Sequence, residues 1–332
     1  MALFRTEIKI PNTEDKITHQ SVLFSIGSCF STEIAEKFQE RKFVVYTNPF
    51  GILFHPQAIE NALLRIYSLQ YYSKGEIFKY KELFLSWDHH SSFNSTKSDD
   101  ILQKINQRID QANEYLRHSN VVFITLATSF VYKLKVNNLT VANCHKVPGE
   151  NFEKYLLSED EIIESLQNCI DICNDVVKNN VQIIFTISPV RHIKDGFFEN
   201  NVSKARLFNA VYQVVNNNKN CKYFPSYELL LDELRDYRFY KSDMIHPNEI
   251  AIEYIWKRFS ETYFSEETQA INVQIEKIIS GLKHKPFNTN TLEYKEFLYS
   301  LLKKITNVEK YLLPEMMSQE TYYIKQLLEN AY

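Results

Sequence analysis

The sequence predicts an α/β fold in which helices cover both faces of a mostly parallel sheet, the three-layer α/β/α arrangement. Short apolar segments alternate with longer segments of helical periodicity over the first 264 residues. From residue 265 onward the pattern is helical, with no strand segment in between. We therefore divide the chain into an α/β domain over residues 1–264 and a helical C-terminal extension over 265–332.

Five apolar segments are the candidate parallel strands. Each is followed by a loop and then by a segment with the helical spacing that a crossover connection requires. The last of these helices carries Pro247 just inside its start, a favoured position for proline. The strands are expected at residues 22–27, 42–47, 120–127, 181–190 and 221–227, and the helices at 30–38, 57–67, 99–117, 158–178, 203–217 and 246–259.

Two further segments predict antiparallel pairs outside this sheet. Residues 77–87 alternate between apolar and polar side chains in the manner of a hairpin. Residues 130–143 predict two short strands around the turn Asn137-Asn138. Residues 144–152 are expected to form a loop.

The C-terminal extension contains two amphipathic segments, at residues 265–284 and 291–313. It has three possible arrangements: packing on the domain, forming part of a lid, or binding a second subunit to give a homo-oligomer. The apolar stripes consist of Ile271, Ile275, Ile278 and Leu282 on the first segment, and of Leu298, Leu301 and Ile305 on the second.

Composition narrows the class of protein. The chain has 332 residues, 44% of them hydrophobic, which is enough for a substantial core. Its net charge of −3 lacks the basic excess of nucleic-acid binders, so we expect no nucleic-acid partner. No secretory signal and no apolar stretch of membrane-spanning length is visible in the sequence. The five cysteines are an odd number and show no C-x-x-C spacing, which suits free thiols better than a set of disulfides. We therefore expect a cytoplasmic protein with reduced thiols and no membrane span.

Gly27, Ser28 and Cys29 lie where the first strand turns directly into a helix. Open α/β folds bind ligands at this carboxyl edge of the sheet. Because the free N–H groups and dipole of a helix N-terminus lower a thiol pKa, we expect Cys29 to be partly thiolate and Ser28 to cap the helix. The alternative is a buried cysteine behind an ordinary N-cap serine.

Asp243 and His246 lie three residues apart in a loop ahead of the last helix. At this spacing a carboxylate can orient an imidazole whose other ring nitrogen faces a nucleophile. Two residues are candidate donors to an oxyanion. Gly51 permits a close backbone approach, and Asn143 offers a side-chain amide near another edge of the sheet. The alternative for both pairs is a structural role in turns and caps.

Several motifs in order resemble one family. They are "IGSCFS", "NPFGILFHP", "NCHKVP", "SPVRHIKDG", "SKARL", "FPSYELLLDELRDYRFY" and "DMIHP". From about Ser21 to Phe259 the chain resembles the GSCFA family, which is grouped with the SGNH/GDSL hydrolases. The resemblance implies a flavodoxin-like SGNH fold with four functional blocks, namely a nucleophile, a glycine N–H donor, an asparagine and an Asp-x-x-His pair.

The resemblance assigns a role to each block of this sequence. The first block departs from the usual Gly-Asp-Ser, because Cys29 stands at the serine position and Ser28 at the aspartate position. Cys29 is therefore the first choice of nucleophile and Ser28 the alternative. The third block lacks the usual Gly-x-Asn-Asp form. The remaining matches are Gly51 for the second block, Asn143 for the third, and Asp243 with His246 for the fourth.

His145, Arg191 and His192 are further polar residues expected near the same edge, where they would bind an anionic part of a substrate or else lie in surface loops. The cysteine and histidine spacings match no zinc signature, so we expect no metal and no cofactor.

The sequence thus predicts a hydrolase or acyltransferase that acts on a small-molecule or glycan acyl ester through a Cys/Ser-His-Asp triad. The competing hypothesis is an inactive SGNH-fold binding or scaffold protein that associates through its C-terminal helices.

Overall fold

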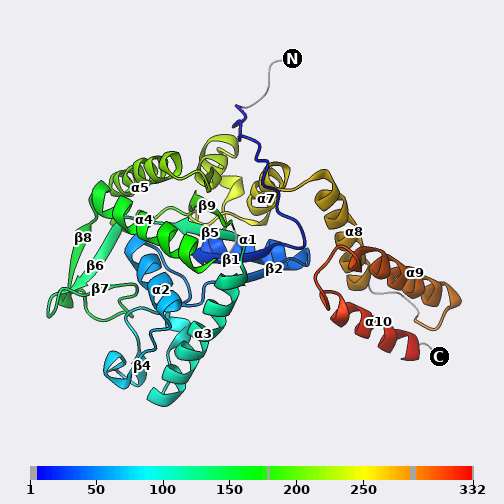
Figure 1. Cartoon of the computed structure of the whole chain (residues 1–332), viewed down its shortest axis with the longest axis horizontal. Helices are drawn as coiled ribbons and strands as arrows, with labels where there is room; N and C mark the ends of the chain where they lie inside the picture. The colour runs from blue at the N-terminus through cyan, green and yellow to red at the C-terminus, as the bar shows by residue number, and fades with distance from the viewer. Residues whose placement is uncertain (1–5, 178–179, 285–288, 331–332) are drawn as a thin grey trace.

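The computed structural model describes residues 6–177, 180–284 and 289–330. Its centre is a sheet of five parallel strands in the order β10–β9–β5–β1–β2 (Figure 1). All five predicted parallel strands and the α/β/α arrangement are confirmed. The strands are β1 (Val22–Gly27), β2 (Val44–Thr47), β5 (Val121–Leu126), β9 (Gln182–Ile187) and β10 (Cys221–Phe224).

The strand order sets the position of the candidate site. In chain order the parallel strands run 2-1-3-4-5 across the sheet, which is the flavodoxin-like order. The direction of winding reverses between β1 and β5, whose residues pair in register from Leu23 opposite Val121 to Gly27 opposite Thr125. Such a reversal leaves a crevice at the carboxyl ends of the two strands, which is where folds of this kind bind ligands.

Two groups of helices cover the two faces of the sheet (Figure 1). Alternate strand residues point to opposite faces, so Phe24 joins one hydrophobic cluster and Leu23 the other. The first face is covered by α2 (Pro56–Ser68), α3 (Ser98–His118), α4 (Glu159–Val176) and α5 (Phe197–Asn217), and the second by α1 (Cys29–Glu40) and α7 (Glu249–Tyr263).

The helix boundaries differ in detail from the sequence prediction. Helix α7 begins one residue beyond its N-cap Asn248, whose side chain accepts the N–H of Ala251 at 3.1 Å. Pro247 therefore lies before the helix and not inside its start. Lys178, the last residue of another predicted helix, lies outside the described residues.

The antiparallel pairs lie outside the central sheet. The predicted hairpin is present as β3 (Phe78–Tyr80) and β4 (Leu83–Leu85), and the second predicted pair as β6 (Phe130–Leu134) and β7 (Thr140–Val141). A strand that was not predicted, β8 (Phe152–Leu156), pairs with the other edge of β6. Its charged residues Glu153 and Lys154 are exposed, which hid its strand character from a hydrophobic pattern.

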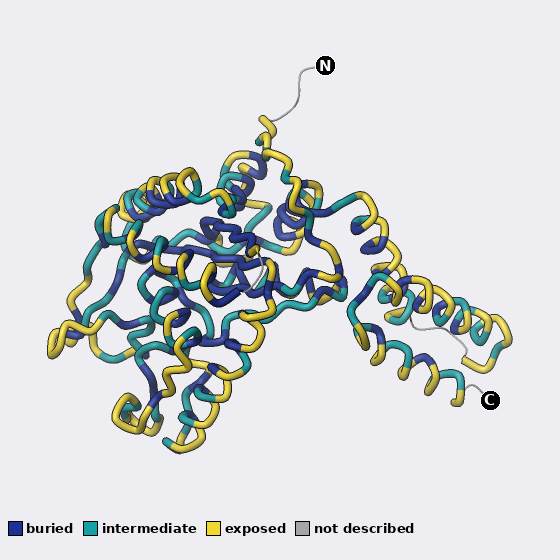
Figure 2. Tube along the Cα trace, viewed as in Figure 1, coloured by how far each residue is buried: buried dark blue, intermediate teal, exposed yellow. Residues whose placement is uncertain are grey.

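The C-terminal extension has a hydrophobic cluster of its own. Helices α8 (Glu266–Lys283), α9 (Leu292–Glu309) and α10 (Ser318–Asn330) surround it, and α10 was not predicted. Figure 2 shows the buried side of each helix turned toward the others. Of the predicted stripe residues, Leu282 is only partly buried, whereas Ile271, Ile275, Ile278, Leu298, Leu301 and Ile305 are buried.

Polar contacts join this extension to the α/β domain beside α1 and β2. Arg41 pairs with Glu276 of α8 at 2.7 Å, and Lys42 pairs with Glu320 of α10 at 2.5 Å. The extension thus contacts the domain through these polar pairs, while its apolar residues pack among its own helices. Association of copies through these helices stays a prediction.

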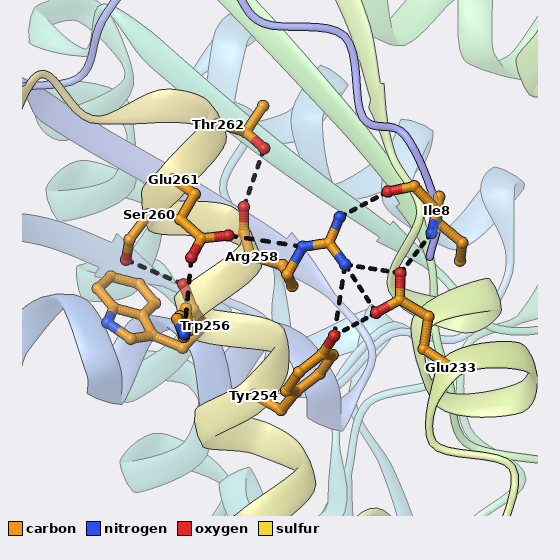
Figure 3. A network of polar contacts seen from close by, with 9 residues as sticks. Ile8, Glu233, Tyr254, Trp256, Arg258, Ser260, Glu261 and Thr262 are labelled. Carbon is orange, nitrogen blue, oxygen red and sulfur yellow. Dashed lines mark hydrogen bonds and ion pairs between the residues drawn. The ribbon is translucent and has the colours of Figure 1, made fainter. Parts of the chain in front are cut away.

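The N-terminal segment is fixed to α7 by a polar network (Figure 3). Both Glu233 carboxylate oxygens accept from Arg258 Nη1, at 2.6 and 2.7 Å, and one also accepts the Ile8 N–H at 2.5 Å. Tyr254 donates to the same carboxylate. Burial alone would raise the pKa of Glu233, but these donors lower it, so the network holds a paired charge.

Among the described helices, none is both long and apolar enough to cross a bilayer.

Candidate active site

Gly27 determines how β1 turns into α1. Its φ is +138°, and a Cβ atom at this position would lie 2.1 Å from the carbonyl oxygen of Thr125 on β5. Only glycine lets the two strand ends approach so closely. The next N–H, from Ser28, donates to the same Thr125 oxygen at 3.1 Å. The turn therefore places Cys29 as the first residue of α1, at the carboxyl edge of the sheet.

Ser28 and Cys29 differ in accessibility. Ser28 occupies the N-cap position, but its side chain makes no capping hydrogen bond, so the expected capping role is wrong. The Ser28 hydroxyl is buried, and within the described part of the chain it has no hydrogen-bond partner. Cys29 is partly exposed. A substrate can therefore approach the thiol more readily than the hydroxyl.

The Cys29 thiol is not activated by the helix alone. Burial raises its pKa, and the nearby Glu33 carboxylate acts in the same direction. The N–H groups of Phe30 and of Cys29 itself lower the pKa, as does the charge of Lys241, but burial outweighs them. The expectation of a partly ionised thiolate is therefore wrong, and the thiol needs a base.

Asp243 and His246 form a hydrogen-bonded pair in the loop before α7. Asp243 Oδ2 lies 2.7 Å from His246 Nδ1. The other carboxylate oxygen, Oδ1, accepts the N–H groups of His246 at 3.0 Å and Ile245 at 2.9 Å. These two N–H groups and then the imidazole lower the pKa of Asp243 to about 2. The carboxylate thus stays ionised and orients the ring, which leaves Nε2 as the nitrogen that can exchange a proton.

Side chains from two other elements hold this loop. Lys241 Nζ lies 3.0 Å from Glu33 Oε1 on α1, the helix that begins at Cys29. Arg191, in the loop after β9, donates from Nη2 to the Met244 carbonyl at 2.5 Å. Its guanidinium also lies 4.8 Å from the centre of the Tyr240 ring. Arg191 therefore supports the Asp243–His246 loop and is not a loose surface residue.

Electrostatic interactions connect the loop to its surroundings. Burial, followed by the charges of Lys204 and His246, lowers the pKa of His192 to about 4 against the opposing charge of Asp195. The His192 ring also packs edge-on against Phe54, with ring centres 5.4 Å apart. The charge of Lys241 acts on the Cys29 thiol. Across the described residues, no hydrogen bond joins His246 to Cys29 or Ser28. In enzymes without bound substrate, the hydrogen bond between base and nucleophile is often long and shortens only when substrate binds.

The loop carrying Gly51 lies beside the turn at Gly27. Asn48 binds both, because its side-chain oxygen accepts the Gly27 N–H at 2.8 Å and its carbonyl accepts the Gly51 N–H at 2.8 Å. A Cβ atom on Gly51 would lie 2.3 Å from the Cβ of His90, so packing requires glycine there. The oxyanion role of Gly51 stays a prediction, since its N–H is bound to Asn48 in this structure.

Asn143 and His145 contact the segment after β4. The Asn143 N–H donates to the Trp87 carbonyl at 3.2 Å, and its side-chain oxygen accepts the His145 N–H at 2.9 Å. His145 Nε2 lies 2.7 Å from the Ser86 carbonyl. The described contacts of His145 thus join it to this segment and not to His246. The oxyanion role of Asn143 and the substrate-binding role of His145 stay predictions.

Two residues of this region were not predicted, Asn48 and Lys204. Asn48 lies in the motif "NPFGILFHP" and Lys204 lies in "SKARL". The resemblance of these motifs to the family therefore pointed to both segments, although the type of side chain alone did not single out either residue. Asn48 also donates to Thr32 Oγ1 at 3.0 Å, which ties its loop to α1.

Within the residues described, no three His, Cys, Asp or Glu side chains are grouped as metal ligands would be.

Replacing Arg191 by methionine should slow any reaction that depends on His246. The variant loses the hydrogen bond to Met244 and the cation–π contact with Tyr240, so the loop holds the imidazole less firmly. We expect about a tenfold fall in kcat with little change in KM, because a charged hydrogen bond contributes on the order of 1.5–3 kcal/mol. Steady-state kinetics beside Arg238→Met, an exposed arginine of the preceding turn, checks this. A rise confined to KM would show that Arg191 binds substrate.

The geometry defines a class of protein: an α/β/α domain with a cysteine, a histidine and an aspartate at the carboxyl edge of its parallel sheet. The chain belongs to the GSCFA family, whose model matches residues 22–259. A second model, described as GSCFA domain protein, C-terminal domain, matches residues 275–330. A search of curated proteins found no match. The first matched range contains the whole central sheet, and the second spans most of the helical extension.

Proposed function

We propose that this protein is an acyl-transfer enzyme that hydrolyses or transfers the acyl group of an ester or thioester, with Cys29 as nucleophile. The observation that carries the proposal is the Asp243–His246 pair, with the two groups 2.7 Å apart at the sheet edge where Cys29 begins α1. The two backbone N–H groups of the turn fix the carboxylate in position, which suits it to orient the imidazole.

The proposed reaction follows from these residues. His246 takes the proton of the Cys29 thiol, whose pKa is raised by burial, and the thiolate attacks the acyl carbonyl. Asp243 holds the ring and stabilises the imidazolium that forms. The N–H of Cys29, together with Gly51 and Asn143 after local adjustment, would stabilise the oxyanion. When the tetrahedral intermediate collapses, the C–O or C–S bond of the substrate breaks and the leaving alkoxide or thiolate takes the proton from His246. The acyl group on Cys29 is then attacked by water, which gives hydrolysis, or by a sugar hydroxyl, which gives acyl transfer, with His246 taking the acceptor's proton and returning it to the departing Cys29 sulfur.

The substrate class is an acyl ester of a small molecule or glycan. The strand order and the block positions support placement in the SGNH/GDSL superfamily, in which carbohydrate O-acyl groups are one substrate class. Arg191 is bound to the Met244 carbonyl and Lys241 is paired with Glu33, while the lowered pKa of His192 leaves its ring neutral near pH 7, so we assign none of the three to an anionic group of the substrate. The five cysteines are free, which supports a reducing, cytoplasmic compartment.

A comparison of Cys29→Ala with Ser28→Ala tests the proposal. Over a panel of p-nitrophenyl esters and acyl thioesters, we expect Cys29→Ala to lose turnover by at least about 10³-fold, as nucleophile removal does elsewhere. Ser28→Ala should keep turnover within a few-fold, because the Ser28 hydroxyl is buried without a partner. The reverse pattern would make Ser28 the nucleophile. Turnover that survives both substitutions would contradict the proposal.

A further inference from the structure

Exposed aromatic rings gather beside the loop that carries His246. Phe197, the first residue of α5, is 62% exposed, and Tyr237 is 61% exposed. The guanidinium carbon of Arg191 lies 6.0 Å from the ring centre of Phe197 and 5.6 Å from that of Tyr237. The Tyr240 ring lies 4.8 Å from the same carbon, and its centre is 5.6 Å from that of Tyr237. We call Phe197, Tyr237 and Tyr240 the aromatic cluster.

Contacts between chain segments hold the aromatic cluster next to the imidazole. Tyr240 pairs with Pro247, the residue after His246, in an isolated antiparallel bridge. Arg191, around which the rings lie, donates to the Met244 carbonyl at 2.5 Å, two residues before His246. The cluster and the imidazole therefore keep a fixed relation to each other.

The strand order places the aromatic cluster away from the candidate oxyanion donor Gly51. Arg191 follows β9 and Tyr237 lies in the connection after β10, whereas Gly51 follows β2 at the opposite edge of the sheet. Cys29 follows β1, between these two regions. An acyl carbonyl whose oxygen is turned toward the Gly51 loop thus has the cluster on its other side.

The chemistry of acyl transfer decides which part of a substrate lies on that side. When the C–O or C–S bond breaks, the leaving oxygen or sulfur takes a proton, which His246 supplies in the proposed reaction. The leaving atom therefore lies within hydrogen-bond reach of His246 Nε2, and the rest of the leaving group extends past the loop where the rings are exposed. Clustered aromatic rings that stay exposed beside a site indicate a binding surface.

We propose that Phe197, Tyr237 and Tyr240 form the subsite for the leaving group, and that this group is an alcohol or thiol carrying a ring whose face packs against theirs. Aromatic rings and the C–H faces of sugar rings share this property. The inference deepens the proposed function and rests on it, because His246 has to be the proton donor. In the second half of the reaction the same surface binds a ring-bearing acceptor, which then competes with water for the acyl group on Cys29.

The test compares ratios of kcat/KM between the parent protein and the variants Phe197→Ala and Tyr237→Ala. S-phenyl thioacetate and 1-S-acetyl-1-thioglucose are each measured against S-ethyl thioacetate, so the intrinsic reactivity of each ester cancels between proteins. We expect at least one of these ratios to fall about fivefold in both variants, the size of effect when one ring contact is lost. The ratio that falls identifies the kind of ring.

Two controls separate the leaving group from the acyl group and from nonspecific effects. The ratio of S-ethyl thiohexanoate to S-ethyl thioacetate, which varies only the acyl chain, should stay unchanged in both variants. Tyr212→Ala removes an equally exposed ring on α5, 71% exposed and about 22 Å further along the helix than Phe197, and should change no ratio. Unchanged ring ratios in Phe197→Ala and Tyr237→Ala would overturn the inference, as would a change confined to the acyl-chain ratio.

Alkylation of Cys29 makes the test independent of acyl turnover. The thiolate displaces iodide from iodoacetamide or from its N-phenyl derivative iodoacetanilide, and the Cys29 peptide is quantified by mass spectrometry. We expect the rate ratio of the anilide to the amide to fall severalfold in Phe197→Ala and Tyr237→Ala and to stay unchanged in Tyr212→Ala. In a protein without ester turnover, a lowered ratio would support a ring-binding site beside Cys29 and contradict only the proposed function, whereas an unchanged ratio would overturn both.

Discussion

Replacing His246 by alanine is expected to reduce acyl turnover by about 10³-fold or more while leaving the melting temperature within a few degrees. In the proposed mechanism the imidazole is the base for the Cys29 thiol, whose pKa is raised by burial. The side chain is 41% exposed and its contact is with Asp243 in the same loop, so its removal opens no core cavity. Steady-state kinetics and thermal unfolding of the same preparations measure both quantities.

Asp243→Asn should cost about 10²- to 10⁴-fold, because an amide no longer fixes the productive tautomer of the ring. The pKa of Asp243 is about 2, so its carboxylate stays ionised as the pH falls toward that value. An acid limb of the rate profile well above pH 2 therefore reports another group. Asp236→Asn is the control, since that exposed carboxylate likewise accepts a local N–H, from Arg238 at 2.9 Å. Full activity in His246→Ala would show that the pair has no part in turnover.

Gly27→Ala is expected to destabilise the whole α/β domain. The added methyl group would lie 2.1 Å from the Thr125 carbonyl, at a φ of +138° that side chains rarely adopt. Because β1 and β5 are central strands, the clash cannot be relieved at an edge of the sheet. We expect a loss of about 4 kcal/mol or more in the free energy of unfolding, measured by urea denaturation.

Gly149→Ala provides the comparison for Gly27→Ala. Among the described residues, no atom beyond Gly149 and its two chain neighbours lies within 4 Å of the position a Cβ would take there, so the effect on the free energy of unfolding should stay within about 0.5 kcal/mol. Equal midpoints for the two variants would contradict the close approach of β1 to β5. A folded Gly27→Ala protein with unchanged Cys29 alkylation would contradict the role given to the turn in positioning the thiol.

The sequence predicted the central sheet because β1, β5 and β9 are almost entirely buried and therefore read as continuous apolar runs. It also predicted the location of Cys29, Asp243 and His246, since loops at the carboxyl ends of parallel strands meet at one edge. It missed β8 because charged residues interrupt that strand. A hydrophobic pattern depends on apolar residues, so β2, whose sequence is Val-Val-Tyr-Thr, was found, whereas β8 with its exposed Glu153 and Lys154 was not.

Electrostatics was harder to predict than topology. The helix N-terminus suggested a low thiol pKa for Cys29, but the pKa also depends on burial, which only the folded structure shows. Lys204 carries no sign in the sequence that it is buried, since lysine is almost always exposed. Likewise, the hydrogen bond from Gly51 to Asn48 depends on the loop conformation and not on residue type.

Mapping the acyl adduct by peptide mass spectrometry tests the central claim most directly. The protein is incubated with p-nitrophenyl acetate and an acyl thioester, quenched in acid and digested, with His246→Ala in parallel. We predict an acyl group on Cys29 that accumulates in the parent protein and not in His246→Ala. A Cys29 adduct that forms equally in both proteins, or no adduct together with no turnover across the ester panel, would contradict the account and favour a binding protein with this fold.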